Sequence, residues 1–490
     1  MIIRSRLDVR FFVFGNGYFG EYVCVPYHVK LKNLYQATLK FKNYIYLCRK
    51  FEREYVTIRK IFLLIVVMLV SVSAEAQTDS IVATHLRQRG VRLTDGNKLW
   101  FFDNGHDKFV DLLAEVQRAK SFIHLEYFNF RNDSIAGLLF QLLAQKVREG
   151  VEVRAMYDSF GNSSNNRPIS RHMHDSICAL GIRLVKFDPI RFPWVNHIIP
   201  RDHRKIVVID GRVAYTGGMN VADYYIEGIS GIGEWHDLHM HIEGPAVDDL
   251  HHIFARIWQK VTGEAISGMK YFPQEYGVAM YTPPARAASS APTANPKFYL
   301  PLQQHPTSLA RLAVIDRATD KTSDAIRDLY ATMLDAAQRS VKIVNPYFVP
   351  THRVRSALKR AVDRGVDVEI LLSAKGDIPM TPDVTHYVGN NLMKRGAKVF
   401  LYEGGFHHTK MMIVDDQFCT VGSANLDARS LRCDYEVNTL ILSHEHTRQL
   451  IDMFEDQKRS AVQIHKGYWR TKPAWKRFLG WLGNLLTPVM

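Results

Sequence analysis

Short apolar runs alternate with longer stretches of helical periodicity along most of the chain. The run 122–128 is followed by 136–148, where leucines and a valine recur at helical spacing, and then by a second apolar run, 151–157. Gly150 ends the helical stretch, the position at which a glycine commonly closes the last turn. The pattern therefore predicts a strand, an amphipathic helix and a second strand.

The same order of elements returns in the second half of the chain. The runs 341–348, 354–364 and 366–372 repeat the first three, and Gly365 takes the place of Gly150. Four matching stretches keep their order at offsets between 205 and 219 residues, far longer than a solenoid repeat. The chain therefore contains a duplicated domain. Strands that alternate with helices predict an α/β fold, which we expect to consist of two mostly parallel sheets with helices outside.

Composition marks the boundaries of the expected segments. A stretch rich in Pro, Ala and Ser, with no apolar period, separates the two copies. We expect a basic N-terminal extension at 1–58, a signal-peptide-like or membrane segment at 59–77, a first lobe at 95–281, a linker at 282–297, a second lobe at 298–465 and a basic amphipathic tail at 466–490.

The net charge of +14 is concentrated near the N-terminus. Residues 1–60 hold 12 Lys and Arg against 4 Asp and Glu, which leaves +6 for the rest of the chain. A basic balance favours an anionic partner but does not choose among lipid, nucleic acid and phosphate ester. The five cysteines are odd in number and show no metal-ligand spacing, so we expect neither a disulfide framework nor a zinc site.

One segment near the N-terminus has the pattern of a signal peptide. The wholly apolar run 61–70 follows a basic pair and precedes a small-x-small site at 74–76. The run is short for a full membrane span, which takes ~20 apolar residues. A signal peptide that starts so far into the chain is unusual, which leads to the hypothesis that 1–58 is a mis-assigned extension and that translation starts near Val56 or Ile58.

The C-terminal tail combines basic and aromatic side chains. No acidic residue follows Asp456, and Lys and Arg alternate with Tyr and Trp between 466 and 481. Basic residues near an anionic surface contribute ~1 kcal/mol each, and indoles favour the membrane interface. Apolar residues also recur at helical spacing from Trp475 onward. The tail therefore predicts an interfacial helix, and the competing interpretation is a helix that packs against the lobes.

Both copies contain the pattern His-x-Lys-x4-Asp. The first copy supplies His203, Lys205 and Asp210, and the second supplies His408, Lys410 and Asp415. Each motif continues into a predicted strand and then into a glycine-containing turn with an asparagine, Asn220 or Asn425, seventeen residues after the histidine. A single copy would be a weak signal, but two copies at the same place in a duplicated domain make chance remote.

These residue types suit chemistry on a phosphodiester. Residues i and i+2 of a strand share a face, so each histidine and its lysine are expected to project together. Two lysines and two asparagines can hold the non-bridging oxygens and stabilise charge in the transition state. One imidazole can attack phosphorus and form a covalent intermediate, and a second can protonate the leaving oxygen, which contributes ~10²–10⁴-fold in rate. Because each copy supplies one histidine, this chemistry needs both.

Each catalytic histidine also needs an acid on its far ring nitrogen. Asp237 and Glu436 lie at similar distances downstream of the two motifs, and we assign them this role against the alternative of surface or structural acids. Asp210 and Asp415 end their predicted strands and are expected to position the motif rather than to react. Other histidines, which include His172, His174, His239 and His241, have no second ligand-type residue at a matching spacing. We expect them to be structural, and we expect no metal to be bound.

At these residues the chain resembles the phospholipase D superfamily and, within it, bacterial cardiolipin synthases of the two-motif kind. The resemblance covers roughly 95–445 and includes IHLEYFNFRND (123–133), NPYFVP (345–350) and GSANLDARSLRCDYEVN (422–438). It implies two α/β lobes around a pseudo-two-fold axis, a site between them and no cofactor. It further implies transfer of a phosphatidyl group between two phosphatidylglycerol molecules through a phosphohistidine, with release of glycerol.

Carried over to this chain, the resemblance makes His203 the nucleophile and His408 the general acid. The implied partners are a membrane surface and phosphatidylglycerol or another anionic phospholipid, and no nucleic acid is expected. The implied location is the bacterial inner membrane, and the signal-peptide-like segment suggests that the chain faces the periplasm. The chain departs from the family in having one short apolar run where two transmembrane helices are usual, and Cys433 where asparagine is common.

Three alternatives remain open at this point. The first is a hydrolytic phospholipase D with water as acceptor, and the second is a nuclease on the same fold. The mild charge of the body and the membrane signals at both ends of the chain disfavour the nuclease. The third, a non-catalytic lipid-binding protein, is disfavoured by the six intact motif residues.

Overall fold

A computed structural model gives the structure of the chain. No helix among the residues that it describes is long and apolar enough to cross a membrane. The predicted segments 1–58, 59–77 and 282–297 lie outside the described residues, which are 81–189, 199–273, 308–319 and 322–486.

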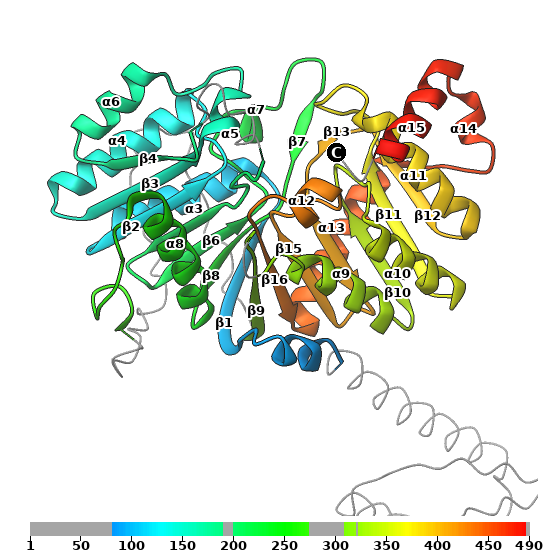
Figure 1. Cartoon of the computed structure of the whole chain (residues 1–490), viewed down its shortest axis with the longest axis horizontal. Helices are drawn as coiled ribbons and strands as arrows, with labels where there is room; N and C mark the ends of the chain where they lie inside the picture. The colour runs from blue at the N-terminus through cyan, green and yellow to red at the C-terminus, as the bar shows by residue number, and fades with distance from the viewer. Residues whose placement is uncertain (1–80, 190–198, 274–307, 320–321, 487–490) are drawn as a thin grey trace, which may run out of the picture. The chain divides into compact units, whose positions relative to one another are not determined.

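A continuous sheet of fifteen strands runs through both copies of the duplicated domain (Figure 1). From one edge to the other the strands are β17 (Ala461–Gln463), β12 (Lys398–Tyr402), β11 (Asp367–Ser373), β10 (Ser340–Val344), β14 (Met411–Val414), β15 (Phe418–Gly422), β16 (Glu436–Leu442), β9 (Ala310–Arg317), β1 (Leu93–Phe102), β8 (His239–Glu243), β6 (Val213–Gly217), β5 (Ile206–Ile209), β2 (Phe122–Tyr127), β3 (Glu152–Asp158) and β4 (Arg183–Phe187). Outward from the central pair β9 and β1, the two halves repeat each other strand for strand as far as β12 and β4. This is the pseudo-two-fold arrangement of two lobes that the resemblance implies.

The expectation of two mostly parallel sheets is wrong. Strands β1 and β9 pair antiparallel, with Leu93 opposite Ala313, and so join the lobes into one sheet. Among the described strands, parallel pairing is confined to β2–β3–β4 and β10–β11–β12. Helices link the successive strands within these two sets. By contrast, the short connections from β5 to β6 and from β14 to β15 are tight turns, which impose antiparallel pairing.

Helices cover both faces of the sheet and bury its apolar side chains (Figure 1). One face is covered in the first lobe by α3 (Gly105–Arg118), α4 (Ser134–Arg148) and α6 (Arg171–Ala179), and in the second lobe by α9 (Ala325–Ala336), α10 (His352–Asp363) and α11 (Thr381–Arg395). The other face is covered by α8 (Ala246–Thr262) and α13 (His444–Arg459). Apolar residues on this second face form a core that spans both lobes, with Leu250 of α8 and Leu450 of α13 in the same cluster. The lobes therefore share a hydrophobic core as well as a sheet.

The predicted helices are confirmed as α4 and α10. Both end at a glycine in the left-handed region, where φ is 87° at Gly150 and 85° at Gly365. Further helices of the fold are α5 (Ser159–Ser163), α7 (Tyr224–Glu227), α12 (Ala428–Arg432), α14 (Tyr468–Thr471) and α15 (Ala474–Leu486).

A second, two-stranded sheet connects the lobes at one end of the molecule (Figure 1). Strand β7 (Glu234–His236) of the first lobe pairs in parallel with β13 (Gly405–His407) of the second. The two backbones approach so closely that a Cβ at Gly405 would lie 2.2 Å from the carbonyl oxygen of Glu234. Glycine is therefore required at this position, which directly precedes the second motif.

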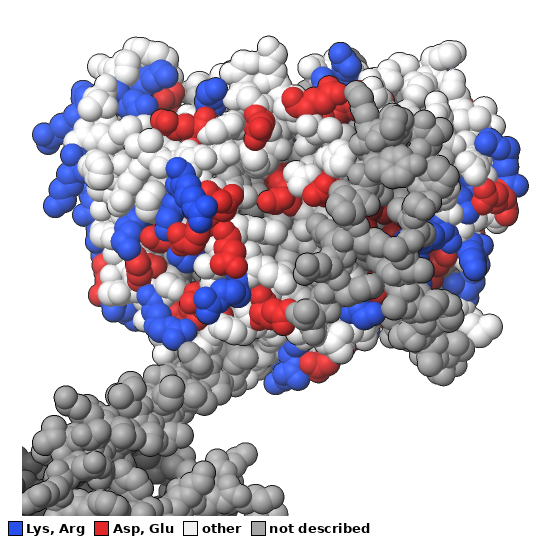
Figure 2. Space-filling view, turned by 180° about the vertical axis from the view of Figure 1, so that it is seen from behind, with Lys and Arg blue, Asp and Glu red and all other residues white. Residues whose placement is uncertain are grey.

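The face of the molecule seen from behind carries both signs of charge. Figure 2 shows Lys and Arg side chains mixed with Asp and Glu over the coloured part of this face. Nucleic-acid-binding surfaces usually gather basic side chains into a patch or stripe. The mixed charge agrees with the modest basicity of the chain after residue 60.

Candidate active site

The two motif segments lie where the lobes meet. The His-x-Lys part of each motif precedes its strand, β5 or β14, rather than lying on it as the sequence pattern predicts. The other lobe holds each segment in an extended conformation. The backbone N–H of His203 donates to the carbonyl oxygen of Tyr435 at 3.0 Å, and that of His408 donates to the carbonyl oxygen of His236 at 2.6 Å.

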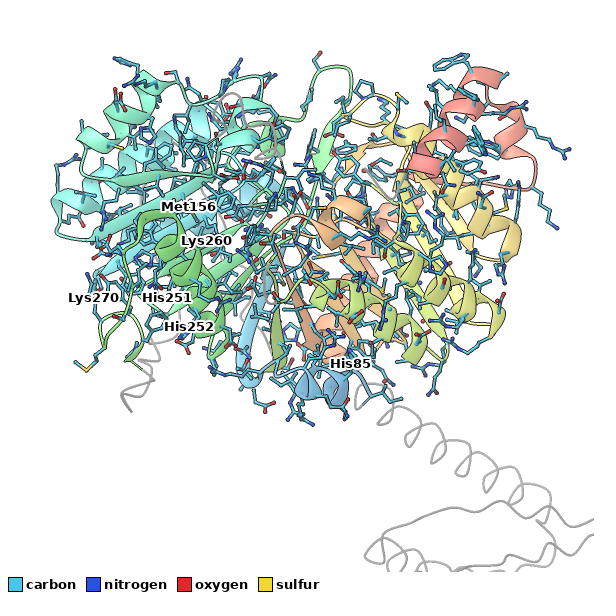
Figure 3. All side chains as sticks on the ribbon, in the orientation of Figure 1. His85, Met156, His251, His252, Lys260 and Lys270 are labelled. Atoms are coloured by element: carbon cyan, nitrogen blue, oxygen red, sulfur yellow. The ribbon has the colours of Figure 1, made fainter. Side chains whose placement is uncertain are left out.

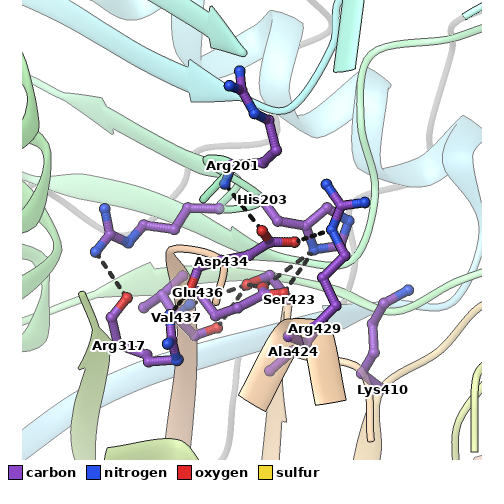
Figure 4. A network of polar contacts seen from close by, with 12 residues as sticks. Arg201, His203, Arg317, Lys410, Ser423, Ala424, Arg429, Asp434, Glu436 and Val437 are labelled. Atoms are coloured by element: carbon purple, nitrogen blue, oxygen red, sulfur yellow. Dashed lines mark hydrogen bonds and ion pairs between the residues drawn. The ribbon is translucent and has the colours of Figure 1, made fainter. Parts of the chain in front are cut away.

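Each motif histidine bonds a carboxylate from the opposite lobe, and Figure 4 shows the pair formed by His203 and Glu436. The Nδ1 atom of His203 lies 3.0 Å from Oε1 and 3.2 Å from Oε2 of Glu436. The Nδ1 atom of His408 lies 2.6 Å from Oδ2 of Asp237. Asp237 thus follows the first motif in the sequence but contacts the histidine of the second. Glu436 follows the second motif and contacts the histidine of the first. Neither lobe alone contains a complete histidine–acid pair.

The two carboxylates are held differently. In the second lobe the hydroxyl of Ser423 donates to Oε2 of Glu436. Gly218 occupies the corresponding position in the first lobe, where a Cβ would lie 2.1 Å from Oδ1 of Asp237. That oxygen accepts instead from the backbone N–H of Leu238 at 2.8 Å. Serine supports the longer acid, and glycine makes room for the shorter one.

Both motif lysines are buried between the histidine–acid pairs. Each Nζ donates to the carbonyl oxygen of its own histidine, and Nζ of Lys410 also lies 2.7 Å from Nδ1 of His408. Burial lowers the pKa of Lys205 to about 7, with a further lowering from the charge of Lys410 and opposition from Glu436. Burial likewise lowers the pKa of Lys410 to about 8. The two ammonium groups therefore lie close enough to repel each other, an arrangement suited to an anionic ligand.

Burial and charge set the protonation of the histidine–acid pairs. Burial lowers the pKa of both imidazoles, to about 4 at His408, where Lys410 adds to the effect. Burial alone would raise the pKa of Glu436, but His203 and the lysine charge outweigh it and lower the pKa to about 2. The pKa of Asp237 is lowered in the same way, against burial, by Lys410 and His408. At pH 7 each carboxylate is ionised and accepts the Nδ1–H of a neutral imidazole, whose Nε2 keeps its lone pair.

Comparison with known proteins identifies the family. The family described as cardiolipin synthase, PLD-like domain, matches residues 112–258 and 330–458, that is, both lobes. The chain belongs to this family. It is similar to cardiolipin synthase 2 of Bacillus cereus, with 31% identity over 388 residues that cover 79% of this chain and 70% of the relative. Cardiolipin synthase 1 of Staphylococcus aureus is also 31% identical, over 403 residues that cover 81% of this chain and 75% of the relative.

Solved structures support the same fold for this member of the cardiolipin synthase family. The crystal structure of a phosphatidylserine synthase from Haemophilus influenzae matches it with a TM-score of 0.61 and 12% identity. The match covers 84% of this chain and 100% of the other. The two-lobed architecture is therefore shared by a protein with little sequence in common.

Two aromatic rings pack beside the motif imidazoles. The Phe128 ring lies edge-on to His203, with centroids 5.0 Å apart, and Tyr347 lies edge-on to His408 at 6.0 Å. The Tyr347 hydroxyl donates to Asp377 at 2.7 Å. Sequence reasoning did not single out these rings. The signal was present, because the repeat that relates 121–130 to 340–349 aligns Phe128 with Tyr347.

The two predicted phosphate-binding asparagines are buried just beyond β6 and β15. Oδ1 of Asn220 accepts from the backbone N–H of Asn129 at 3.4 Å. Oδ1 of Asn425 is buried without a hydrogen-bond partner among the described residues. Their contact with a phosphate stays a prediction.

The motif aspartates lie at the far ends of β5 and β14 from the histidines. Asp210 accepts from the backbone N–H groups of Lys120, Ser121 and Phe122, and Asp415 accepts from those of Gln338, Arg339 and Ser340. Seven residues of extended chain at ~3.3 Å each separate histidine from aspartate, a span of roughly 20 Å. Their contacts fit the predicted positioning role, because each ties its motif strand to the start of β2 or β10.

Other histidines have local partners. The Nδ1 atom of His239 accepts from the backbone N–H of Met219 at 3.3 Å, and that of His241 lies 2.7 Å from Asp111. Figure 3 shows His251 on α8, where its Nε2 lies 2.9 Å from Nδ1 of His124. Among the described residues no cluster of three or more His, Cys, Asp or Glu could hold a metal ion.

Proposed function

We propose that this protein is a cardiolipin synthase-type phosphatidyltransferase, which joins two phosphatidylglycerol molecules and releases glycerol. The observation that carries the proposal is the pair of histidine–carboxylate contacts with two buried lysines between them. The named functions of relatives that match about four fifths of the chain support it. The six motif residues and the acids Asp237 and Glu436 keep the roles assigned to them from the sequence.

In the first step, Nε2 of His203 attacks the phosphorus of one phosphatidylglycerol. A P–N bond forms, the P–O bond to the headgroup glycerol breaks, and the leaving oxygen takes a proton from His408. The anionic phosphodiester itself promotes this protonation state, because a bound negative charge raises the pKa of a nearby imidazole. Lys205 and Lys410, with Asn220 and Asn425, hold the non-bridging oxygens while charge develops.

In the second step, a headgroup hydroxyl of another phosphatidylglycerol gives its proton to His408. Its oxygen attacks phosphorus and the P–N bond breaks, which restores His203 and yields cardiolipin. The net reaction exchanges one ester for another and needs no external energy source. Water in place of the second lipid would give phosphatidic acid, the product of a hydrolytic phospholipase D.

We place the enzyme at a bacterial membrane, since both substrates are phospholipids. The segment 59–77 is proposed to attach or export the chain. We also propose the domain division at 95–281 and 298–465; the two sets of strands, β1–β8 and β9–β17, support it, although β1 already begins at Leu93.

The test is an assay of the purified protein on phosphatidylglycerol vesicles, with products identified by lipid mass. We expect cardiolipin and glycerol, and no turnover by His203→Ala or His408→Ala variants that remain folded. A phosphoryl adduct trapped by rapid quenching in denaturant at neutral to mildly alkaline pH should map to His203. Phosphatidic acid as the main product would replace the transferase by a hydrolase, and cleavage of DNA without lipid turnover would refute the proposal.

A further inference from the structure

Helix α15 carries large apolar side chains on its outer face. Trp475, Phe478, Trp481 and Leu485 are 59%, 55%, 47% and 60% exposed, and their spacing places them along one side of the helix. Single exposed apolar residues are common on soluble proteins, but a contiguous group marks an interaction surface. The outer face of α15 is such a group.

The inner face of α15 is fixed against α11. A Cβ at Gly480 would lie 2.7 Å from the carbonyl oxygen of Asp383, and a Cβ at Gly483 would lie 2.3 Å from a methyl of Val384. Arg355 of α10 donates to the side-chain oxygen of Asn484 at 2.9 Å. The helix therefore packs on the second lobe through its small residues. The structure bears out the packing interpretation of the tail for this face, while the outer face stays exposed.

Two further exposed apolar side chains precede α11. Ile378 is 49% exposed and Met380 is 46% exposed. Asp377, beside them in the chain, accepts a hydrogen bond from Tyr347, whose ring packs on His408. Figure 1 shows α14 and α15 at the same end of the molecule as β7 and β13. The exposed apolar residues thus lie on the side of the protein that holds the catalytic groups.

The charges of the tail itself are basic, whereas Asp377 adjoins Ile378. Lys466, Arg470 and Arg477 are exposed, and no acidic residue occurs from 457 to 490. Lys472 and Lys476 lie near enough to α11 to lower the pKa of His386, together with the burial that is its main cause. An apolar helical face with a basic flank matches an anionic lipid surface better than a second copy of this chain, whose corresponding face would be equally basic.

We propose that the outer face of α15, with Ile378 and Met380, inserts into the interface of an anionic phospholipid bilayer and holds the catalytic groups next to it. This rests on the proposed function and adds the surface through which the enzyme meets its substrate. Lipids would then reach the site from the bilayer without full transfer into water.

The direct test uses the two exposed indoles of the full-length protein as depth probes. Their fluorescence is obtained as the difference between the wild type and a Trp475→Phe/Trp481→Phe variant. On phosphatidylglycerol vesicles with brominated acyl chains we expect this difference signal to fall at least twofold relative to plain vesicles. An equal signal in both kinds of vesicle overturns the proposal, however the rest of the chain binds.

A kinetic test removes the apolar face with Trp475→Ser/Phe478→Ser/Trp481→Ser. Turnover of vesicle phosphatidylglycerol should fall at least tenfold, while turnover of a short-chain, monomeric phosphatidylglycerol stays within twofold of wild type. Met269 and Leu309 are similarly exposed but lie outside this surface, so the matched control Met269→Ser/Leu309→Ser should change neither rate. Equal loss on both substrates would show that the face is structural and overturn the proposal.

Two other outcomes are distinguishable. If the triple variant converts a dimer into a monomer in sedimentation velocity, and brominated lipid does not quench, the face joins two copies and the proposal is wrong. If the wild type turns over neither substrate, the proposed function fails, while the quenching experiment still decides whether this surface meets the bilayer.

Discussion

The crossed pairing of histidines and acids can be measured without any catalytic assay. His203→Ala combined with Glu436→Gln, and His408→Ala combined with Asp237→Asn, form two double-mutant cycles in unfolding free energy. The structure predicts energetic coupling within each of these pairs, because their side chains are in contact. The pairs taken from one lobe, His203 with Asp237 and His408 with Glu436, are the matched controls.

The expected size of the coupling follows from the geometry. The imidazole of His203 contacts both oxygens of Glu436, at 3.0 and 3.2 Å, and the carboxylate is fully buried. A hydrogen bond to a charged group contributes about 1.5–3 kcal/mol. Gln keeps the shape of the acid and can still accept the Nδ1–H, so we expect a coupling near the lower end, about 1.5 kcal/mol. The shorter contact between His408 and Asp237 should give at least as much.

The assay is equilibrium unfolding in urea at pH 7, followed by tryptophan fluorescence, for each single and double variant. Control pairs from one lobe should couple by less than about 0.5 kcal/mol, the usual limit for residues without direct contact. Strong coupling in the control pairs, with none in the crossed pairs, would refute the assignment of each acid to the opposite histidine. So would a purely additive result for all four pairs.

Two further predictions concern pH and packing. With monomeric phosphatidylglycerol, kcat/KM should fall as pH rises through about 7 to 8, where Lys205 and Lys410 lose their charge. Lys205→Arg, which stays charged, should move this fall upward, and a profile flat from pH 6 to 10 would contradict the reasoning. Gly218→Ala forces a methyl to within 2.1 Å of Oδ1 of Asp237 and should slow turnover by about 10²-fold or more, as displaced catalytic groups do. Ser423→Ala, by contrast, removes one hydrogen bond to the charged Glu436, about 1.5 kcal/mol, and should cost about tenfold in steady-state rate; equal effects of the two variants would show that Gly218 is not needed for space.

Local patterns in the sequence were sufficient for the elements and the duplication. Helices α4 and α10 are set by apolar spacing and a terminal glycine, both of which are properties of neighbouring residues. The fold class followed from their alternation with strands. The two motifs were visible because a phosphodiester site needs the same few residue types in each copy.

The joining of the two sheets could not be read from local pattern. It depends on Leu93 pairing with Ala313, more than two hundred residues away, and edge strands of two separate sheets would show the same alternation. The crossing of the acids was hidden for the same reason. Spacing along the chain placed Asp237 after the first motif and Glu436 after the second. Each acid reaches the histidine of the opposite lobe only when the two lobes face each other.

The symmetry of the fold is broken by side chains at the active site. The backbone gives both histidines the same support, a main-chain hydrogen bond and a carboxylate from the other lobe. The side chains differ. Glu436 also accepts a hydrogen bond from the hydroxyl of Ser423, whereas Nζ of Lys410 lies 2.7 Å from Nδ1 of His408. Both acids stay anionic at pH 7, since the pKa of Glu436 is about 2 and that of Asp237 is also lowered. Burial and the charge of Lys410 lower the pKa of His408, which favours release of its proton and agrees with the proposed role of His408 as proton carrier and His203 as nucleophile.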